Sequence, residues 1–425
     1  MISLDPAAVA AVVGRLAEVE AERTRRYPGD SGDRQPVHTC YVPAGLITDY
    51  TPGAWGAAAL ALLDEHGPGP VPETVLPRVL RKLGREPVED LRIDFEDGYG
   101  APPDEAEDAD AVRTARSAVA WRGGHGAPPW FGIRVKSFDT ASLRDRSIRT
   151  LDLFVTALFD AAGGQLPDGF VVTFPKVTHV AQVEAFAELL GLLEERLALP
   201  AGALRFEIQV ETAQAVLDAE GRLALPRLIT AGAGRVSGLH FGTYDYTAAL
   251  GLSAVDQHLA HDACDFARHV MQLAAAQTGV RISDGSSNLL PIGNRPAVVE
   301  AWRSHLTLVQ RSLSHGYYQG WDLHPGQLIT RYAANFMFFR AGLVAEAERL
   351  RDYLAKADGG PASARVADEP ATAQALSRSF LRGLDCGAVD ADELATLTGL
   401  DVADLRALSR REPVPDHCGG LSAPA

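Results

Sequence analysis

The sequence has little of what a disulfide-stabilised or membrane-spanning protein requires. Its 425 residues contain only four cysteines, Cys40, Cys264, Cys386 and Cys418, and no two of them form a CxxC pair. A disulfide scaffold, a structural zinc site and a thioredoxin-type redox centre are therefore not expected, and we predict reduced thiols. No apolar run reaches the roughly 18 residues of a membrane-spanning helix.

Positive charge is also scarce. Lys and Arg number 40 against 55 Asp and Glu, which leaves a formal net charge of −15. A protein with this charge repels nucleic acids and anionic membranes, so we expect neither as a partner. The first residues mix acids with bases and lack an apolar segment ending in a cleavage site. We therefore expect no signal peptide and a cytoplasmic location.

Several catalytic signatures are missing as well. The sequence has no GxSxG elbow and no Walker A loop, so neither a serine hydrolase nor a P-loop nucleotidase is supported. A dinucleotide-binding fold needs GxGxxG directly after its first strand. The glycine-rich stretch at 232–238, GAGRVSG, lacks that spacing and lies elsewhere.

The sequence does contain a regular alternation of β-rich and helical segments. Eight short segments rich in β-branched and aromatic residues are each followed by longer stretches with helical periodicity. This alternation predicts a parallel sheet, and eight units predict an α/β (β/α)8 TIM barrel, with an open doubly wound sheet as the alternative. The predicted strands cover residues 37–44, 90–97, 130–137, 169–176, 205–212, 236–243, 279–285 and 317–325. The predicted helices cover residues 54–66, 72–84, 103–121, 139–161, 178–196, 212–230, 255–277, 294–315 and 326–356.

The two ends of the chain differ from the alternating middle. Asp5 and Pro6 suit the cap and first turn of a helix, which we expect over residues 5–25. From about residue 359 the sequence becomes polar and rich in Pro and Gly, and short helical patterns follow. We therefore expect two parts: a TIM-barrel catalytic domain over 1–358, with the barrel at about 37–356, and a linker with a small C-terminal helical cap over 359–425.

Polar residues follow most of the predicted strands. Because functional groups of such barrels project from the carboxyl ends of the strands, these residues are the candidates for a site. Carboxylates that converge there would repel one another unless a cation neutralises them. The candidates are Asp94, Glu96, Asp97, Arg134, Lys136, Lys176, Glu211, Asp245, Asp284 and His324.

Oxygen ligands at such a position predict Mg²⁺, with Mn²⁺ as a substitute, rather than zinc. We expect Glu211 and Asp245 to be the ligands and Arg134 to face the charge that develops on the substrate. Structural alternatives stay open for each residue. Glu211 could cap the next helix and Arg134 could form a structural ion pair.

Similar alternatives apply to the other polar residues at the strand ends. Asp94, Glu96 and Asp97 could pair with Arg92 or form an Asx turn before Gly98. Lys176 could be a solvated strand end, and His324 could start a helix. The histidines and the acid between 258 and 269 lack an HExxH pattern, and we interpret them as an ordinary helix face.

Six motifs in the predicted barrel carry a resemblance to a known family. In this order they resemble the motif series of the HpcH/HpaI aldolase and citrate lyase β-subunit family, over roughly residues 37–330. The resemblance implies a Mg²⁺-dependent barrel that makes or breaks a C–C bond next to a 2-oxo acid, often with a CoA thioester as partner. The motifs are RIDFEDGYG (92–100), GIRVKSF (132–138), FPK (174–176), QVET (209–212), GLHFGTYDYTAALG (238–251) and GWDLHPGQL (320–328).

The same resemblance implies roles for individual residues. It places Glu211 and Asp245 as metal ligands and Arg134 as the substrate arginine, with Glu96 and Asp97 as further catalytic groups around them. We also predict a set of substrate-binding residues, namely Lys176, Gly242, Thr243 and His324, beside Arg134.

Malate synthases share several of these motifs, and their C-terminal part carries a catalytic Asp in a stretch similar to DEPATAQALSR (368–378). Here the aligned acid is Glu369, with Asp368 beside it, so both are candidates for the general base. The chain is shorter than typical malate synthases. After the seventh predicted strand it also reads ISDGSSNLLPIG rather than the Gly- and Met-rich turn of that family.

Together the residues and the resemblance predict an enzyme. We expect a Mg²⁺-dependent carbon–carbon lyase or aldolase that acts on a small 2-oxo acid, hydroxyacid or hydroxyacyl-CoA through a stabilised enolate. The alternatives are a malate-synthase-like condensation of acetyl-CoA with glyoxylate, a phosphoenolpyruvate-type transfer and a non-catalytic binding scaffold. The resemblance further implies a homo-oligomer, either a trimer or a hexamer.

Overall fold

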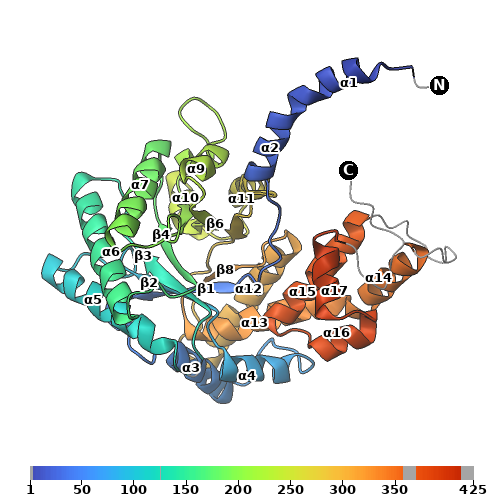
Figure 1. The fold of residues 1–425 in the computed structure, drawn as a ribbon. Helices are drawn as coiled ribbons and strands as arrows, with labels where there is room; N and C mark the ends of the chain where they lie inside the picture. Colours follow the sequence, from blue (N-terminus) through green and yellow to red (C-terminus); the bar gives the residue numbers. More distant parts are fainter. Residues whose placement is uncertain (1–2, 125, 358–369, 413–425) are drawn as a thin grey trace.

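A barrel of eight parallel strands forms the centre of the protein. The computed structural model describes residues 3–124, 126–357 and 370–412. The strands pair in the order β7-β6-β5-β4-β3-β2-β1-β8, and backbone hydrogen bonds from Asp284 to Gln319 (2.8 Å) and from Trp321 to Gly285 (3.3 Å) bring the two edges together. The predicted TIM-barrel fold is confirmed (Figure 1). The strands are β1 (His38–Pro43), β2 (Asp90–Asp94), β3 (Trp130–Arg134), β4 (Phe170–Phe174), β5 (Phe206–Val210), β6 (Val236–Phe241), β7 (Arg281–Ser283) and β8 (Gly320–Asp322).

Helices surround this barrel because each carries an apolar stripe that packs on the strands. Side-chain caps fix several of their first turns, as where Thr140 accepts the backbone N–H of Leu143 and Asn294 accepts that of Ala297. The surrounding helices are α3 (Thr51–His66), α4 (Leu76–Arg85), α5 (Asp104–Trp121), α6 (Ala141–Ala161), α7 (Val180–Arg196), α8 (Ala213–Val216), α9 (Leu225–Ala231), α10 (Thr243–Ala249), α11 (Asp262–Ala275), α12 (Arg295–Ser314) and α13 (Pro325–Ala341).

Three predicted helices differ from the structure. The stretch 212–230 holds the short helices α8 and α9 with a turn between them, in which Asp218 accepts the backbone N–H of Arg222 and Gly221 has φ +74°. The helix predicted over 255–277 begins only at Asp262. The one predicted over 326–356 divides at Gly342 into α13 and α14 (Leu343–Ala357). Local turn chemistry outweighed helical periodicity in the first case.

Both ends of the chain are helical, as expected. The helix predicted over 5–25 consists of α1 (Pro6–Val13), a 3-10 turn and α2 (Ala17–Arg26), which lead away from the barrel with all their residues exposed (Figure 1). The C-terminal part contains α15 (Pro370–Cys386), α16 (Ala391–Thr398) and α17 (Val402–Ser409). The boundary predicted at 358/359 falls outside the described residues, so the division into two domains stays a prediction.

Ion pairs join the C-terminal helices to the side of the barrel. Arg340 of α13 lies 2.9 Å from Glu393, and Arg78 of α4 lies 2.8 Å from Asp390. The helices therefore pack beside α13 and α4 (Figure 1).

The strands bury apolar side chains outward and polar ones inward. Leu91, Ile93, Ile133 and Ile208 are fully buried between the strands and the helices. Many barrels of this fold fill their interior with branched aliphatic residues, whereas this one places charged groups there.

A buried ion-pair network occupies the middle of the barrel. Arg92 lies 2.8 Å from Asp90 and 2.9 Å from Glu207, and Glu207 lies 3.1 Å from His240. The carboxylates and the guanidinium neutralise one another in a region without solvent, which explains why each can stay buried. Arg92 is therefore not the partner of Asp94 that the sequence left open.

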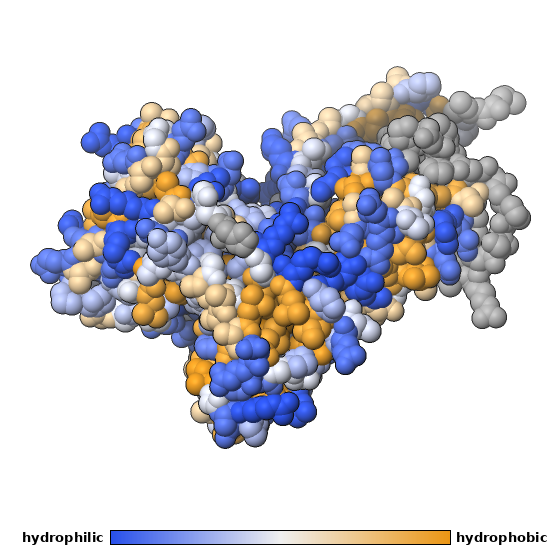
Figure 2. Space-filling model, turned by 90° about the horizontal axis from the view of Figure 1, so that it is seen from below, coloured by the Kyte–Doolittle hydropathy of each residue, from blue (hydrophilic) through white to orange (hydrophobic). Residues whose placement is uncertain are grey.

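No helix among the described residues is long and apolar enough to cross a membrane. On the face seen from below, hydrophobic residues gather in patches separated by hydrophilic ones (Figure 2). Cys40, Cys264 and Cys386 are buried free thiols, and Cys418 lies outside the described residues.

Candidate active site

Polar side chains meet at the mouth formed by the carboxyl ends of the strands. β2 ends at Asp94, which lies in register with Arg134, the last residue of β3. Lys176 and Glu211 follow β4 and β5, and Asp245 lies in the first turn of α10, just after β6. Because parallel strands of a barrel end at one face, the order of these residues in the sequence becomes a ring in space.

Asp94 holds Arg134 in a two-point ion pair. The Nε and Nη2 atoms of Arg134 each donate to one oxygen of Asp94 at 2.7 Å, and its Nη1 lies 3.1 Å from Glu96. The same Asp94 accepts the backbone N–H groups of Glu96 and Gly98, both at 2.9 Å, which closes the turn after β2. A turn and an ion pair, the two structural alternatives, are thus both present. The turn and the ion pair together hold the guanidinium of Arg134 so that its Nη1 atom faces Glu96 at the mouth.

Lys176 connects the carboxylates of the mouth. Its ammonium lies 2.7 Å from Glu96, 3.0 Å from Asp97 and 3.5 Å from Asp245, and its backbone N–H donates to Glu211 at 2.7 Å. Burial opposes its charge, but Glu211 and Glu96 outweigh that effect and raise the pKa of Lys176. Its φ of +50° is in the left-handed region, which persists for a non-glycine residue only where surrounding contacts fix it.

Glu211 is deeply buried in this mouth, with 2% of its surface exposed, as is Asp94. One oxygen accepts the backbone N–H of Lys176, and the other accepts the amide of Gln209 at 3.1 Å. Burial raises the pKa of Glu211 to about 8, and the negative charges of Glu96 and Asp245 add to the shift. Glu211 therefore ionises fully near neutral pH only if further positive charge comes close.

Negative charge exceeds positive charge at the mouth, and this excess shows whether the site would suit a metal ion. The two cations Arg134 and Lys176 face five carboxylates, those of Asp94, Glu96, Asp97, Glu211 and Asp245. A divalent cation would remove this excess, and donors that are all oxygen suit Mg²⁺ or Mn²⁺. The side chain of Asp245 is 45% exposed and only loosely paired, so its oxygens are accessible to a cation. The donor set fits such an ion.

Gly242 and Thr243, predicted to bind substrate, lie directly against Glu211. A Cβ atom at Gly242 would lie 2.4 Å from the Cβ and 2.6 Å from Oε2 of Glu211, so only glycine permits this approach. Thr243 begins α10, is 1% exposed, and its hydroxyl has no hydrogen-bond partner among the described residues. Contact of either residue with a substrate stays a prediction.

Other residues singled out from the sequence make structural contacts. The ammonium of Lys136 lies 3.0 Å from Glu107 and donates to a backbone carbonyl. Asp284 lies 2.9 Å from Arg268 and is 1% exposed, so it links β7 to α11 rather than lining the mouth. His324 accepts a backbone N–H and caps α13, which is the helix start that the sequence left open.

The two candidate bases, Asp368 and Glu369, lie outside the described residues. The helix that follows them, α15, begins at Pro370, and its residues Gln374 and Arg378 line a cavity at the opposite end of the barrel. A role of either acid as the base stays a prediction.

The residues beneath the mouth were not predicted from the sequence. Gln209 holds Glu211, and the rings of Tyr41 and Trp321 lie 4.5 Å apart below Arg134, whose guanidinium is 5.0 Å and 6.0 Å from them. The strand period of two was the available signal, because Gln209 precedes Glu211 by two residues and therefore shares its face.

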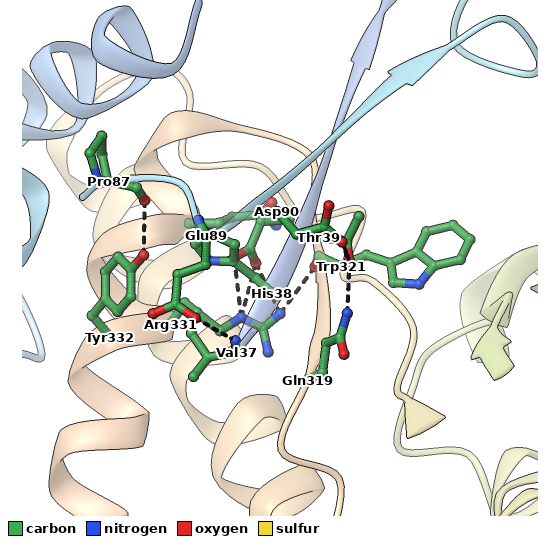
Figure 3. A network of polar contacts seen from close by, with 12 residues as sticks. Val37, His38, Thr39, Pro87, Glu89, Asp90, Gln319, Trp321, Arg331 and Tyr332 are labelled. Carbon is green, nitrogen blue, oxygen red and sulfur yellow. Dashed lines mark hydrogen bonds and ion pairs between the residues drawn. The ribbon is translucent and has the colours of Figure 1, made fainter. Parts of the chain in front are cut away.

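A second group of potential metal ligands lies in the barrel wall. Among the described residues, ligand atoms of His38, Cys40 and Asp322 all lie within 4.8 Å of one another, and the three side chains are buried. Arg331 reaches this group from α13, near His38 (Figure 3). It lies 2.9 Å from Asp322, while His305 lies 3.2 Å from the same carboxylate. Burial opposes ionisation, but Arg331 and the histidines hold the pKa of Asp322 well below its usual range. The carboxylate is already neutralised, so this group joins strands to a helix and leaves no charge for a metal.

Comparison with known proteins gives a family and a partial relative. The model of the family described as "Domain of unknown function (DUF6986)" matches residues 16–413. A segment of 121 residues is 39% identical to an L-malyl-CoA/β-methylmalyl-CoA lyase of Haloarcula marismortui and covers 28% of this chain. The match covers 31% of that relative, so the chain spans about a third of its length. Over this segment the resemblance predicted from the motifs is confirmed.

Two solved structures are also similar to this chain at low sequence identity. One is the malate synthase of Haloferax volcanii in complex with magnesium and glyoxylate, at 14% identity, a TM-score of 0.49, and coverage of 70% of this chain and 75% of that one. The other is CitE of Mycobacterium tuberculosis with magnesium, acetoacetate and coenzyme A, at 16% identity, a TM-score of 0.45, and coverage of 84% and 99%.

Proposed function

The chain belongs to the DUF6986 family, and from that premise we propose that it is a divalent-metal-dependent carbon–carbon lyase. Its substrate would be a small hydroxyacyl-CoA or hydroxy-oxo acid bound at the mouth of the barrel. The observation that carries the proposal is the buried Glu211, held beside Lys176 within an excess of carboxylates. The partial relative, named as a lyase of malyl-CoA and β-methylmalyl-CoA, supports the class of substrate.

Glu211 and Asp245 would hold the Mg²⁺ or Mn²⁺ ion, which when bound supplies positive charge that offsets the charge developing on the substrate oxygens. Arg134 adds a fixed positive charge. Because Asp94 engages its Nε and Nη2 at 2.7 Å, the guanidinium cannot turn, and Nη1 is the donor left to face a substrate in exchange for Glu96.

Cleavage of a 3-hydroxyacyl compound needs a proton acceptor. The C–C bond breaks, the hydroxyl becomes a carbonyl as it loses its proton, and the electron pair of the bond forms an enolate that is then protonated on carbon. Burial raises the pKa of Glu96, although Arg134 and Lys176 oppose the shift, so Glu96 suits proton exchange better than an exposed carboxylate. We assign Glu96 to the hydroxyl proton, and Asp97 to the positioning of Lys176.

Substrates offered with and without Mg²⁺ test this proposal. L-Malyl-CoA, citramalyl-CoA and 4-hydroxy-2-oxo acids are supplied in parallel with glyoxylate plus acetyl-CoA, and the 2-oxo acid and free CoA are followed. We expect metal-dependent formation of a 2-oxo acid from a hydroxyacyl-CoA or hydroxy-oxo acid. Release of free CoA only from glyoxylate plus acetyl-CoA would replace the lyase by a malate-synthase-like condensation.

A pair of matched variants separates the site from general effects. Glu211→Gln should abolish turnover and weaken Mn²⁺ binding, whereas Glu188→Gln, an exposed change on α7, should alter neither. Turnover retained in Glu211→Gln would refute the ligand assignment. No turnover together with no binding of Mg²⁺ or Mn²⁺ to the unmodified protein would refute the enzyme and favour a binding scaffold.

A further inference from the structure

A cavity lies at the end of the barrel opposite the mouth. It has a volume of about 490 Å³, within the range of small-molecule sites. Gln35 before β1, Arg281 at the start of β7 and Tyr318 before β8 line it, which places it at the amino ends of the strands. One face of α15 and the end of α17 close its other side.

Arginine side chains from two parts of the fold line this cavity. Arg281 comes from the barrel, while Arg378 and Arg382 lie one turn apart on α15. The two α15 arginines share Asp30, at 3.9 Å and 3.6 Å, distances too long for hydrogen bonds. The guanidinium groups therefore retain donors that no described carboxylate satisfies at close range.

No carboxylate of the described residues lies within ion-pair distance of Arg281, although Asp33 and Glu207 act on it from farther away. Arg281 is half-buried and makes no hydrogen bond or ion pair with any described residue, and its guanidinium lies 5.8 Å from the centre of the Trp130 ring. Burial lowers the pKa of Arg281, although the more distant Asp33 opposes the shift. A partly buried guanidinium with no carboxylate at ion-pair distance keeps donors with which an anion can pair.

The rest of the cavity wall is mixed: the carboxylates of Asp33 and Asp385 and several uncharged polar side chains lie beside an apolar and aromatic part. Val37, Ile282 and Phe339 line it, and Tyr318 lies under the guanidinium of Arg382, with 4.3 Å from that group to the ring centre. A planar or aliphatic body could pack on these side chains while its charged end meets the arginines. The combination of charge and apolar surface defines the chemistry of a ligand.

We propose that this cavity binds a small organic anion, with a carboxylate or phosphate facing Arg281, Arg378 and Arg382 and an apolar body against Tyr318 and Phe339. The ligand would bridge the barrel and the C-terminal helices, because the cationic groups come from both. The site is independent of the metal-binding mouth, and its occupation does not rest on the proposed lyase activity.

Binding of simple aromatic anions to the full chain tests the proposal. Benzoate and phenyl phosphate represent the carboxylate and the phosphate, and benzyl alcohol is the neutral analogue. Calorimetry and the fluorescence of Trp130, compared with Trp130→Phe, follow binding. We expect saturable binding of at least one anion, weaker binding of inorganic phosphate, which lacks the apolar body, and none of benzyl alcohol.

Variants locate the binding site. Arg281→Gln and Arg378→Gln should each weaken binding about tenfold or more, since each removes a charge-assisted hydrogen bond. Arg205→Gln removes an exposed arginine at the same end of the barrel and should leave binding unchanged, as should Glu211→Gln at the mouth. Circular dichroism checks that each variant is folded, and Arg281→Lys, which keeps the charge, should bind better than Arg281→Gln.

Two results would overturn the proposal. One is the absence of saturable binding of both benzoate and phenyl phosphate to the unmodified protein. The other is unchanged affinity in folded Arg281→Gln and Arg378→Gln, or loss of affinity in Glu211→Gln alone, which would place the anion at the mouth. Preference for benzoate over phenyl phosphate, or the reverse, decides between a carboxylate and a phosphate ligand.

Discussion

An alanine at position 242 tests how Glu211 is held without removing any group of the site. The added Cβ would lie 2.4 Å from the Cβ and 2.6 Å from Oε2 of Glu211. Non-bonded carbon atoms pack best at about 3.5–4.0 Å, so one side must move by roughly 1 Å. Both residues follow paired strands, and the backbone N–H of Gly242 donates to Val210 at 3.0 Å. We therefore expect the carboxylate of Glu211 to move rather than the backbone.

The size of the effect follows from this displacement. Overpacking of a buried position lowers the free energy of unfolding by about 1–3 kcal/mol. A catalytic group displaced by about 1 Å loses roughly 100-fold in rate. Gly242→Ala should therefore remain folded, bind Mn²⁺ more weakly, and show kcat/KM about 100-fold lower on whichever substrate the unmodified protein cleaves.

Urea unfolding followed by circular dichroism, together with a Mn²⁺ titration, measures both effects. Gly84→Ala is the matched control, because a Cβ at this exposed position of α4 meets nothing within 4 Å. It should be neutral or slightly stabilising, since alanine favours a helix over glycine. A Gly242→Ala protein with the stability and Mn²⁺ affinity of the unmodified chain would refute the steric argument and the placement of Glu211.

Three further predictions concern stability, each measured by urea unfolding. Burial opposes the ionisation of Glu89, but Lys82 and Arg34 outweigh it and lower the pKa of Glu89 from 4.5 to about 2. The resulting stabilisation of the folded protein, about 3 kcal/mol, should be complete above pH 4.5 and lost as the pH falls toward 2. A Glu89→Gln protein that loses stability with acid in the same way would contradict this prediction. Arg331→Met leaves the carboxylate of Asp322 buried without its main partner and should lower the free energy of unfolding by about 3–5 kcal/mol. Adding Asp322→Asn should restore part of that loss, and strictly additive losses would argue against the pair. Thr140→Ala removes the cap of α6 and should lower the free energy of unfolding by about 1 kcal/mol; an unchanged midpoint would show that water replaces the cap.

The sequence predicted the barrel well because strand and helix signals are local. All eight strands lie within the predicted segments, since runs such as 206–210 and 170–174 combine β-branched and aromatic residues between turn residues. The errors lie where local polar chemistry interrupts a helical pattern. In 212–230 the turn at Asp218 to Arg222 replaces what periodicity alone predicted as one helix.

The sequence predicted which residues lie at the candidate site but not which of them contact one another. That Glu96, Arg134, Lys176, Glu211 and Asp245 meet at one face follows from their places after the strands. Which charges pair depends on the register of neighbouring strands, which the sequence alone does not state.

The distribution of charge in the interior shows the same limit. Arg92 and Glu207 belong to different strands, and only closure of the barrel brings them within 2.9 Å. Asp284 likewise follows a strand as Glu211 does, yet it turns toward Arg268 on α11. A carboxylate at a strand end pairs with the nearest cation, and the packing of the folded chain decides which residue supplies that cation.

The sequence by itself determined the alternation of strands and helices, because periodicity and turn chemistry act between residues close in the chain. The alternation in turn determined the barrel and the end of the barrel at which the polar residues that follow the strands gather. Only the tertiary structure decided that Asp94 binds Arg134 and that Gly242 lies against Glu211. It also decided that no carboxylate of the described residues comes within ion-pair distance of Arg281 beside the cavity. Those contacts join residues far apart in the chain, and their free energy depends on distance and burial, which exist only after the chain has folded.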